Sequence, residues 1–221
     1  IIYLNFLYKK RYLNIKINNY FRNCFKILKS GIFIQIRNMC LKLLNILLIK
    51  QILFYDIQGV ELASYIISNK MIDLGIVSYF GIGTIGYTMV PANTKNKEEI
   101  MKRVFYWSHL LSILTLLYVG IFSHVLPYLT SDILVINKIK EKIPLLYSIL
   151  VVQGYSNNYD GLLLGYKKFH IQTLFAVFTL LTGKICFYFS KNINHLWYSI
   201  LSIYSLRLLL LKLYNNKYIT E

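Results

Sequence analysis

Long apolar runs, separated by short polar connectors, occupy most of the chain. Six such runs are found, at residues 30–54, 60–90, 104–129, 143–165, 171–189 and 196–213. A helix needs about 20 apolar residues to cross the hydrocarbon core of a bilayer, where it satisfies its own backbone hydrogen bonds. The sequence therefore predicts an all-α integral membrane protein, in which six transmembrane helices form one bundle over residues 30–214.

The composition favours a membrane protein, because only 15% of the residues are charged and 56% are hydrophobic. Soluble domains carry about 25% charged residues. The formal net charge of +16 is typical of nucleic-acid binders, but here the basic residues gather in residues 1–29 and in the connectors. A nucleic-acid binder presents a basic face on a soluble fold, so we expect no nucleic-acid partner.

The basic connectors also predict a topology, because the cytoplasmic loops of membrane proteins are enriched in lysine and arginine. Positive charges are concentrated before the first run, between the second and third, between the fourth and fifth, and after the sixth. These places share one side of the membrane if the runs alternate in direction. We therefore expect a basic cytoplasmic flank at 1–29, a short tail at 215–221, and both termini in the cytoplasm.

Residues for catalysis or metal binding are not grouped in the sequence. The three cysteines and four histidines are scattered, without a C-x-x-C or H-x-x-x-H spacing. No Ser-His-Asp arrangement or phosphate-binding loop can be assembled either. We therefore expect no enzyme, no cofactor and no metal site. The chain begins with Ile1 rather than methionine, which is typical of a piece of a longer protein.

The fourth run contains the segment QGYSNNYDGLLLG, whose polar residues are unusual in hydrocarbon. Gln153, Asn157 and Asp160 fall on one side of a helix, within about 60° of one another at 100° per residue. A carboxylate inside a membrane faces a water-filled cavity or pairs with a cation. Arg37 and Arg207 are the cations that the sequence offers. The stripe predicts either a substrate and ion path beside an aqueous cavity, or a structural ion pair.

Glycines in the second and fourth runs indicate close packing or bending of helices. The second run matches G-x-G-x-x-G, but no strand–turn–helix context surrounds it, so nucleotide binding is not expected. Glycines let a neighbouring helix approach closely, and proline permits a bend. The residues predicted for these roles are Gly81, Gly83, Gly86, Pro91, Gly161 and Gly165. In the second run, Lys70 and Asp73 are three residues apart and are predicted to neutralise one another.

Six motifs follow one another along the chain: SGIFIQIR with Arg37, QGVELA at Gln58–Ala63, ANTKNKEEIMKRV, LPYLTSDILVI, QGYSNNYDGLLLG and LWYSILSIYSLRLLL. In this order they resemble the C-terminal half of a transporter of the MATE family (multidrug and toxic compound extrusion), closest to its DinF and plant branch. The resemblance covers residues 25–214.

The resemblance implies that the chain is one six-helix lobe of a twelve-helix fold. Substrate would move between two such lobes by alternating access. The implied activity is ion-coupled antiport, exporting organic cations, drugs or organic anions against a proton or sodium gradient. The implied partners are the missing N-terminal lobe, a small-molecule substrate and membrane lipid. This chain lacks that lobe, in which the branch keeps its proton-linked aspartates, so the coupling chemistry is not carried over.

Two alternatives to a transporter remain from the sequence. The chain could be a non-transporting membrane scaffold or a remnant lobe, whose polar groups only hold helices together. It could also be a flippase for lipid-linked oligosaccharides from the same superfamily, because such relatives line their cleft with basic residues. Lys42, Lys70 and Lys184 lie within the predicted spans and would serve that role.

Overall fold

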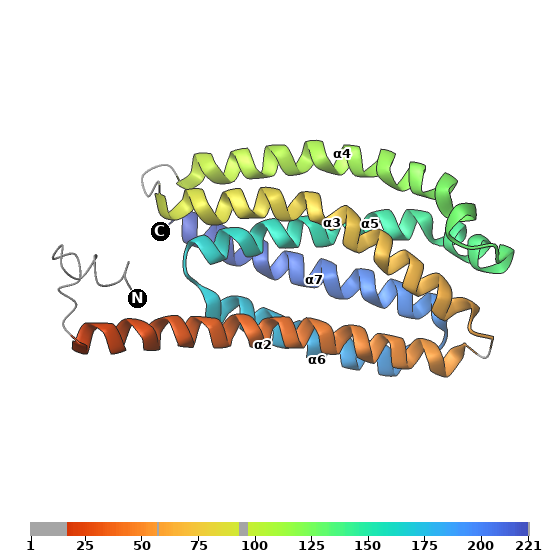
Figure 1. Ribbon diagram of the computed structural model, residues 1–221, viewed down its shortest axis with the longest axis horizontal. Coiled ribbons are helices and arrows are strands. Elements are labelled where there is room, and N and C mark those ends of the chain that lie inside the picture. Colours follow the sequence, from red (N-terminus) through yellow and green to blue (C-terminus); the bar gives the residue numbers. More distant parts are fainter. Residues whose placement is uncertain (1–16, 57, 93–96, 221) are drawn as a thin grey trace, which may run out of the picture.

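The computed structural model describes residues 17–56, 58–92 and 97–220, and within them every regular element is an α-helix. The first 16 residues of the predicted basic flank lie outside the described residues. In Figure 1 the helices lie side by side in one elongated bundle, with the start of α2 and the end of α7 at the same end. They are α2 (Ile17–Tyr55), α3 (Val60–Ala92), α4 (Lys97–Leu129), α5 (Ile133–Gly165), α6 (Phe169–Phe189) and α7 (Ile193–Thr220).

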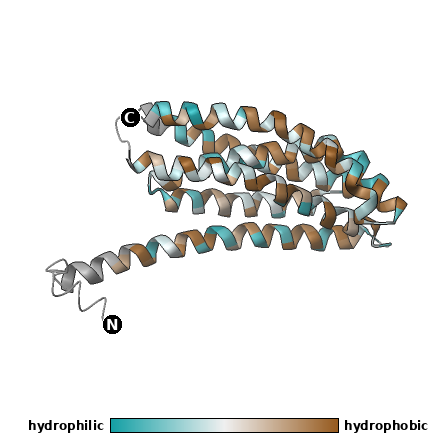
Figure 2. Ribbon diagram, turned by 45° about the horizontal axis from the view of Figure 1, so that its top comes forward, coloured by the Kyte–Doolittle hydropathy of each residue, from teal (hydrophilic) through white to brown (hydrophobic). Residues whose placement is uncertain are grey.

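Five of these helices are long and apolar enough to cross a membrane, namely α2, α3, α4, α6 and α7. Apolar residues extend along the whole bundle (Figure 2). Many large ones are exposed, among them Phe54 at 77%, Ile113 at 67% and Leu74 at 66%. Soluble proteins rarely expose apolar surface on this scale, whereas lipid accepts it. The chain is thus an all-helical protein of integral membrane character.

Helix α5 contains the remaining predicted span, 143–165, but it is not among the five. The reason is its polar content, which lies between Gln153 and Asp160 and lowers its hydropathy. This helix is the one most surrounded by others, since it packs against α3, α4, α6 and α7. In Figure 1, α4 lies on one side of the α3–α5–α7 layer and α2 with α6 on the other. The polar residues of α5 therefore have protein rather than lipid as their main neighbour.

Three helices begin well before their predicted spans and take in polar residues. Helix α2 starts at Ile17 rather than at residue 30, α4 at Lys97 rather than at residue 104, and α5 at Ile133 rather than at residue 143. The start of α5 is capped by Asp132, whose carboxylate accepts a hydrogen bond from the Leu134 N–H at 2.9 Å. Such a cap satisfies the first free N–H groups of a helix, so the connector continues as helix instead of forming a loop.

Glycines bring the backbones of α3 and α5 into contact. A Cβ atom on Gly161 would lie 2.7 Å from the carbonyl carbon of Gly83, and one on Gly165 would lie 3.1 Å from the carbonyl oxygen of Gly86. Side chains at these positions would force the two helices apart, as in other glycine-mediated helix pairs. The four glycines Gly83, Gly86, Gly161 and Gly165 therefore form a seam between α3 and α5.

Gly81 and Pro91 do not contribute to this glycine seam. A Cβ atom on Gly81 would have no atom within 4 Å, so this glycine faces open space. Pro91 stands one residue before the end of α3 at Ala92. The proline therefore marks the end of the helix and does not bend its middle, because no further turn follows that could change direction.

A largely buried ion pair joins α3 to α5 at the end of the bundle where α3 begins. The Lys142 ammonium donates to the Glu61 carboxylate at 2.5 Å, with the two side chains only 7% and 13% exposed. Lys138 reaches the same carboxylate at 3.3 Å. The Lys142 ammonium also lies 5.3 Å from the centre of the Trp197 ring of α7. The first turns of α5 therefore make a tertiary contact, in a segment that the sequence predicts to be a connector.

We expect Glu61→Gln to lower the free energy of unfolding by about 3 kcal/mol, because it leaves the buried Lys142 without its counter-charge. Unfolding in detergent by increasing dodecyl sulfate, followed by circular dichroism, measures this loss. Glu98→Gln is the matched control, since Glu98 pairs with Lys102 on an exposed helix face. Equal stability of the two variants would show that the Glu61 contact does not hold α3 to α5.

Candidate functional site, a buried charge network

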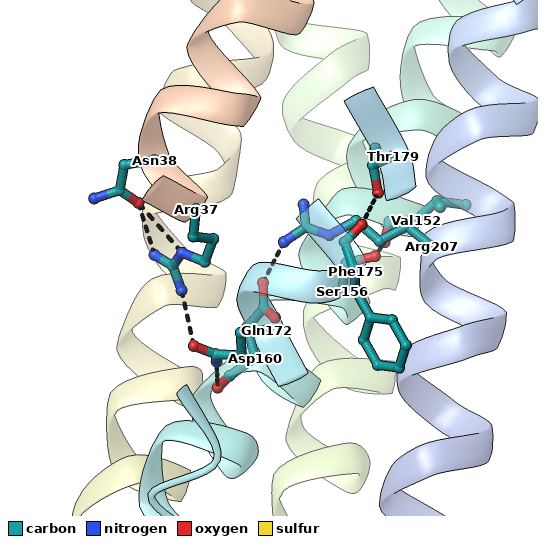
Figure 3. Close-up of polar contacts among 9 residues, drawn as sticks. All are labelled: Arg37, Asn38, Val152, Ser156, Asp160, Gln172, Phe175, Thr179 and Arg207. Atoms are coloured by element: carbon teal, nitrogen blue, oxygen red, sulfur yellow. Dashed lines mark hydrogen bonds and ion pairs between the residues drawn. The ribbon is translucent and has the colours of Figure 1, made fainter. Parts of the chain in front are cut away.

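The centre of the network is an ion pair between α5 and α7. The Arg207 guanidinium of α7 donates to the Asp160 carboxylate of α5 at 2.5 Å, and the two side chains are only 6% and 7% exposed. Asp160 lies about 8 Å inside the end of α5, at 1.5 Å of rise per residue. Figure 3 shows the two side chains pointing toward one another in the interior of the bundle. Both charges are therefore removed from solvent together.

Gln172 extends the network to the helices α6 and α2. Its side-chain amide donates to the backbone carbonyl of Asp160, and its carbonyl oxygen accepts from the Arg37 guanidinium at 3.4 Å (Figure 3). Arg37 also donates to Asn38 at 3.1 and 3.2 Å. Four helices, α2, α5, α6 and α7, are thus joined through one continuous chain of polar contacts.

The network has an excess of positive charge, since it holds one carboxylate and two guanidinium groups. Only Arg207 contacts the carboxylate directly, while Arg37 is separated from it by Gln172. One carboxylate oxygen of Asp160, Oδ1, and the Nε of Arg207 are buried and have no hydrogen-bond partner among the described residues. Unsatisfied buried polar atoms are rare and costly. The ion pair therefore has unused hydrogen-bonding capacity on both of its members.

The other two residues of the predicted polar stripe lie apart from the ion pair. Asn157 is half-buried, and its backbone carbonyl lies against Gly83 in the seam between α3 and α5. Gln153 is also half-buried and lies beside Tyr204 of α7. The three residues share a side of α5 as predicted, but they meet different neighbours.

In the described part of the chain, the Asp160 carboxyl is enclosed between helices, with its side chain only 7% exposed. Of the two cations that the sequence offers, Arg37 and Arg207, it is Arg207 that contacts the Asp160 carboxylate directly. The geometry thus matches the structural ion pair, which is the second of the two predictions for this carboxylate.

Lys70 and Asp73 do not form the predicted pair. Both side chains are exposed on α3, and in the described part of the chain no ion pair joins them. Asp73 instead accepts a weak hydrogen bond at 3.4 Å from Asn69, one turn earlier. An exposed lysine gains little from such a pair and loses side-chain freedom in making it, which accounts for the difference.

The buried contact of Gln172 was not predicted from the sequence, whereas a hydrogen bond between helices was one of the roles that the sequence left open for Asn158. Gln172 lies in the first turn of α6, next to a basic connector, where a polar residue is expected to face solvent. It instead contacts Arg37, which lies 135 positions earlier in the sequence. Asn158 is fully buried and donates to Ser108 of α4 at 2.6 Å. The signal for Asn158 is its position on the closely packed side of α5, where an amide needs a partner on the facing helix.

The described residues contain no group of three metal-ligating side chains. The polar network is an assembly of amides and opposite charges that joins helices of the bundle. Comparison of the chain with protein-family models, curated proteins and solved structures gives no match.

Proposed function

We propose that this chain is one helical lobe of a secondary transporter of the MATE type, in which the Asp160–Arg207 pair holds α7 against α5 in the conformation described. The observation that carries the proposal is a fully enclosed ion pair between two helices of a bundle of membrane character. Intramembrane charges of this kind are costly and mark functional sites in transporters. The order of motifs along the chain supports the same family.

The role proposed for Asp160 differs from that of a residue lining an open path. A proton on the carboxyl would remove its charge and leave Arg207 as an uncompensated buried cation, which weakens the hold of α5 on α7. The Gln172 amide then offers a route by which the same movement reaches Arg37 and α2. Proton uptake would in this way change how the helices pack, while substrate passes between this lobe and a second one.

The proposed activity is antiport of a small organic ion against a proton gradient, with the N-terminal lobe as the partner that completes the path. A sodium ion is the alternative coupling ion, and it would require oxygen ligands that replace Arg207 at Asp160. The flippase alternative is not proposed, because Lys42, Lys70 and Lys184 lie exposed on three different helices and share none of the described cavities.

A second candidate function is a membrane scaffold without transport, and the enclosure of Asp160 favours it. In a scaffold the pair would serve only to fix the order of the helices. Replacing both charges by neutral groups would then leave every property of the protein unchanged except its stability. The two functions therefore differ in their response to the same double substitution.

The experiment compares variants of the full-length parent protein in inverted membrane vesicles with an imposed pH gradient. Asp160→Asn combined with Arg207→Gln removes both charges and leaves groups that can still form hydrogen bonds. We expect this variant to insert and fold but to lose most proton-driven efflux of a fluorescent organic cation. Lys70→Gln is the control for removal of a charge outside the network.

Efflux that keeps its rate and its pH dependence in the double variant would exclude the role of the pair in coupling and favour the scaffold. If the double variant loses efflux because it no longer inserts, the charge exchange Asp160→Arg with Arg207→Asp separates the folding defect from a transport defect. This exchange is expected to restore folding, because the ion pair is kept, but to restore efflux only in part, because the titrating group has moved to α7.

A further inference from the structure

A cavity of about 950 Å³ lies outside the charge network, at the end of the bundle where α5 turns into α6. It is bounded by the first part of α2, by the last turn of α3 and by the α5–α6 turn. Figure 1 and Figure 2 both show α2 lying apart from α3 and α5 in this region. We call this cavity the basic groove, after the two lysines, Lys29 and Lys167, that line it.

The two lysines give the groove an uncompensated positive charge. Both are exposed, no aspartate or glutamate lines the groove, and within the described ranges neither lysine takes part in an ion pair. Lys167 is held in place by the turn, since its φ of 59° is left-handed and its N–H donates to the carbonyl of Leu164 at 2.9 Å. The groove is therefore complementary to an anion.

The remaining walls of the groove are apolar and leave room for a chain of carbon atoms. Ile34 of α2, Leu164 of α5 and Phe169 of α6 line its inner part. Gly31 faces it without a side chain, and a Cβ atom there would meet nothing within 4 Å. An apolar slot beneath two cations fits an amphipathic anion, whose charged head and apolar tail are joined in one molecule.

Both lysines lie near the ends of membrane-length helices, which is the level of the headgroup region of a bilayer. The membrane-length stretch of α2 begins at Ile27, two residues before Lys29, and that of α6 begins at Phe169, two residues after Lys167. Basic pockets between transmembrane helices at a membrane surface recognise anionic lipid headgroups. A lipid also reaches the groove from the side, because α2 leaves it open between the helices.

We propose that the basic groove binds one anionic phospholipid, with its phosphate between Lys29 and Lys167 and one acyl chain along Ile34, Leu164 and Phe169. The site is independent of the transport proposal, because it uses neither Asp160 nor Arg207. A bound lipid would fill the space between the start of α2 and the rest of the bundle. It would thereby fix the position of the helix that carries Arg37.

The experiment uses the full 221-residue chain in nanodiscs of phosphatidylcholine that contain phosphatidylglycerol as the probe. Native mass spectrometry after release into detergent counts the retained phosphatidylglycerol. Lys29→Gln with Lys167→Gln is expected to weaken its retention roughly 30-fold, from the contribution of two lysines at a membrane surface. Gly31→Phe fills the slot without changing charge and is expected to displace the lipid as well.

The matched control is Lys102→Gln with Lys212→Gln, which removes two exposed lysines at the same end of the bundle but outside the groove. This variant is expected to retain phosphatidylglycerol as the parent does. Equal loss in the control would show general attraction to a positively charged chain and would overturn the site. Unchanged retention in the groove variants would overturn it too.

Discussion

Replacing Arg207 with methionine is expected to lower the free energy of unfolding by about 3–5 kcal/mol, the cost of leaving a buried charge without its partner. The carboxylate of Asp160 would remain enclosed, with its other oxygen already without a hydrogen bond. Unfolding by dodecyl sulfate, followed by circular dichroism, measures this loss.

A double variant separates the ion pair from the packing of the two side chains. Arg207→Met combined with Asp160→Leu replaces both charges by apolar groups, and it is expected to recover most of the lost stability, as for other buried pairs. Lys102→Met serves as the control, because its partner Glu98 is exposed and remains solvated. If Arg207→Met proves as stable as Lys102→Met, the pair contributes nothing to holding α5 and α7 together.

Substituting alanine for Gly161 is expected to cost about 3 kcal/mol, because overpacked contacts between helices are relieved only by moving backbones. The new Cβ atom would lie 2.7 Å from the carbonyl carbon of Gly83, in the backbone of α3. Since backbone cannot rotate away as a side chain can, α3 and α5 must separate along the seam. Unfolding by dodecyl sulfate and a cysteine crosslink between the two helices measure these changes.

Gly81→Ala is the matched control for the seam, since it makes the same chemical change on α3 where the new atom meets nothing within 4 Å. It is expected to leave stability unchanged or raise it by up to about 1 kcal/mol, the difference in helix propensity between glycine and alanine. The same unfolding midpoint for both variants would contradict the close contact of α3 and α5.

The positions of the helices could be predicted from the sequence because they depend on local properties. An apolar run of membrane length has to be helical in lipid, whichever helix lies beside it. Predicted starts were wrong for α2, α4 and α5, where polar residues extend the helix beyond the apolar run. At α5 the cap at Asp132 and the contact of Lys142 with Glu61 stabilise helix in a segment too polar to be read as part of a span.

The sequence by itself determined that the chain is helical and of membrane character, and that Asp160 needs a cation or water, since hydrocarbon solvates no carboxylate. Only the tertiary structure decided that Arg207, 47 positions further along the chain, contacts Asp160 in place of Arg37, and that the carboxyl is enclosed. The partner of a charge depends on the order and rotation of neighbouring helices. These follow from packing over the whole bundle, such as the glycine seam, and not from spacing along one helix.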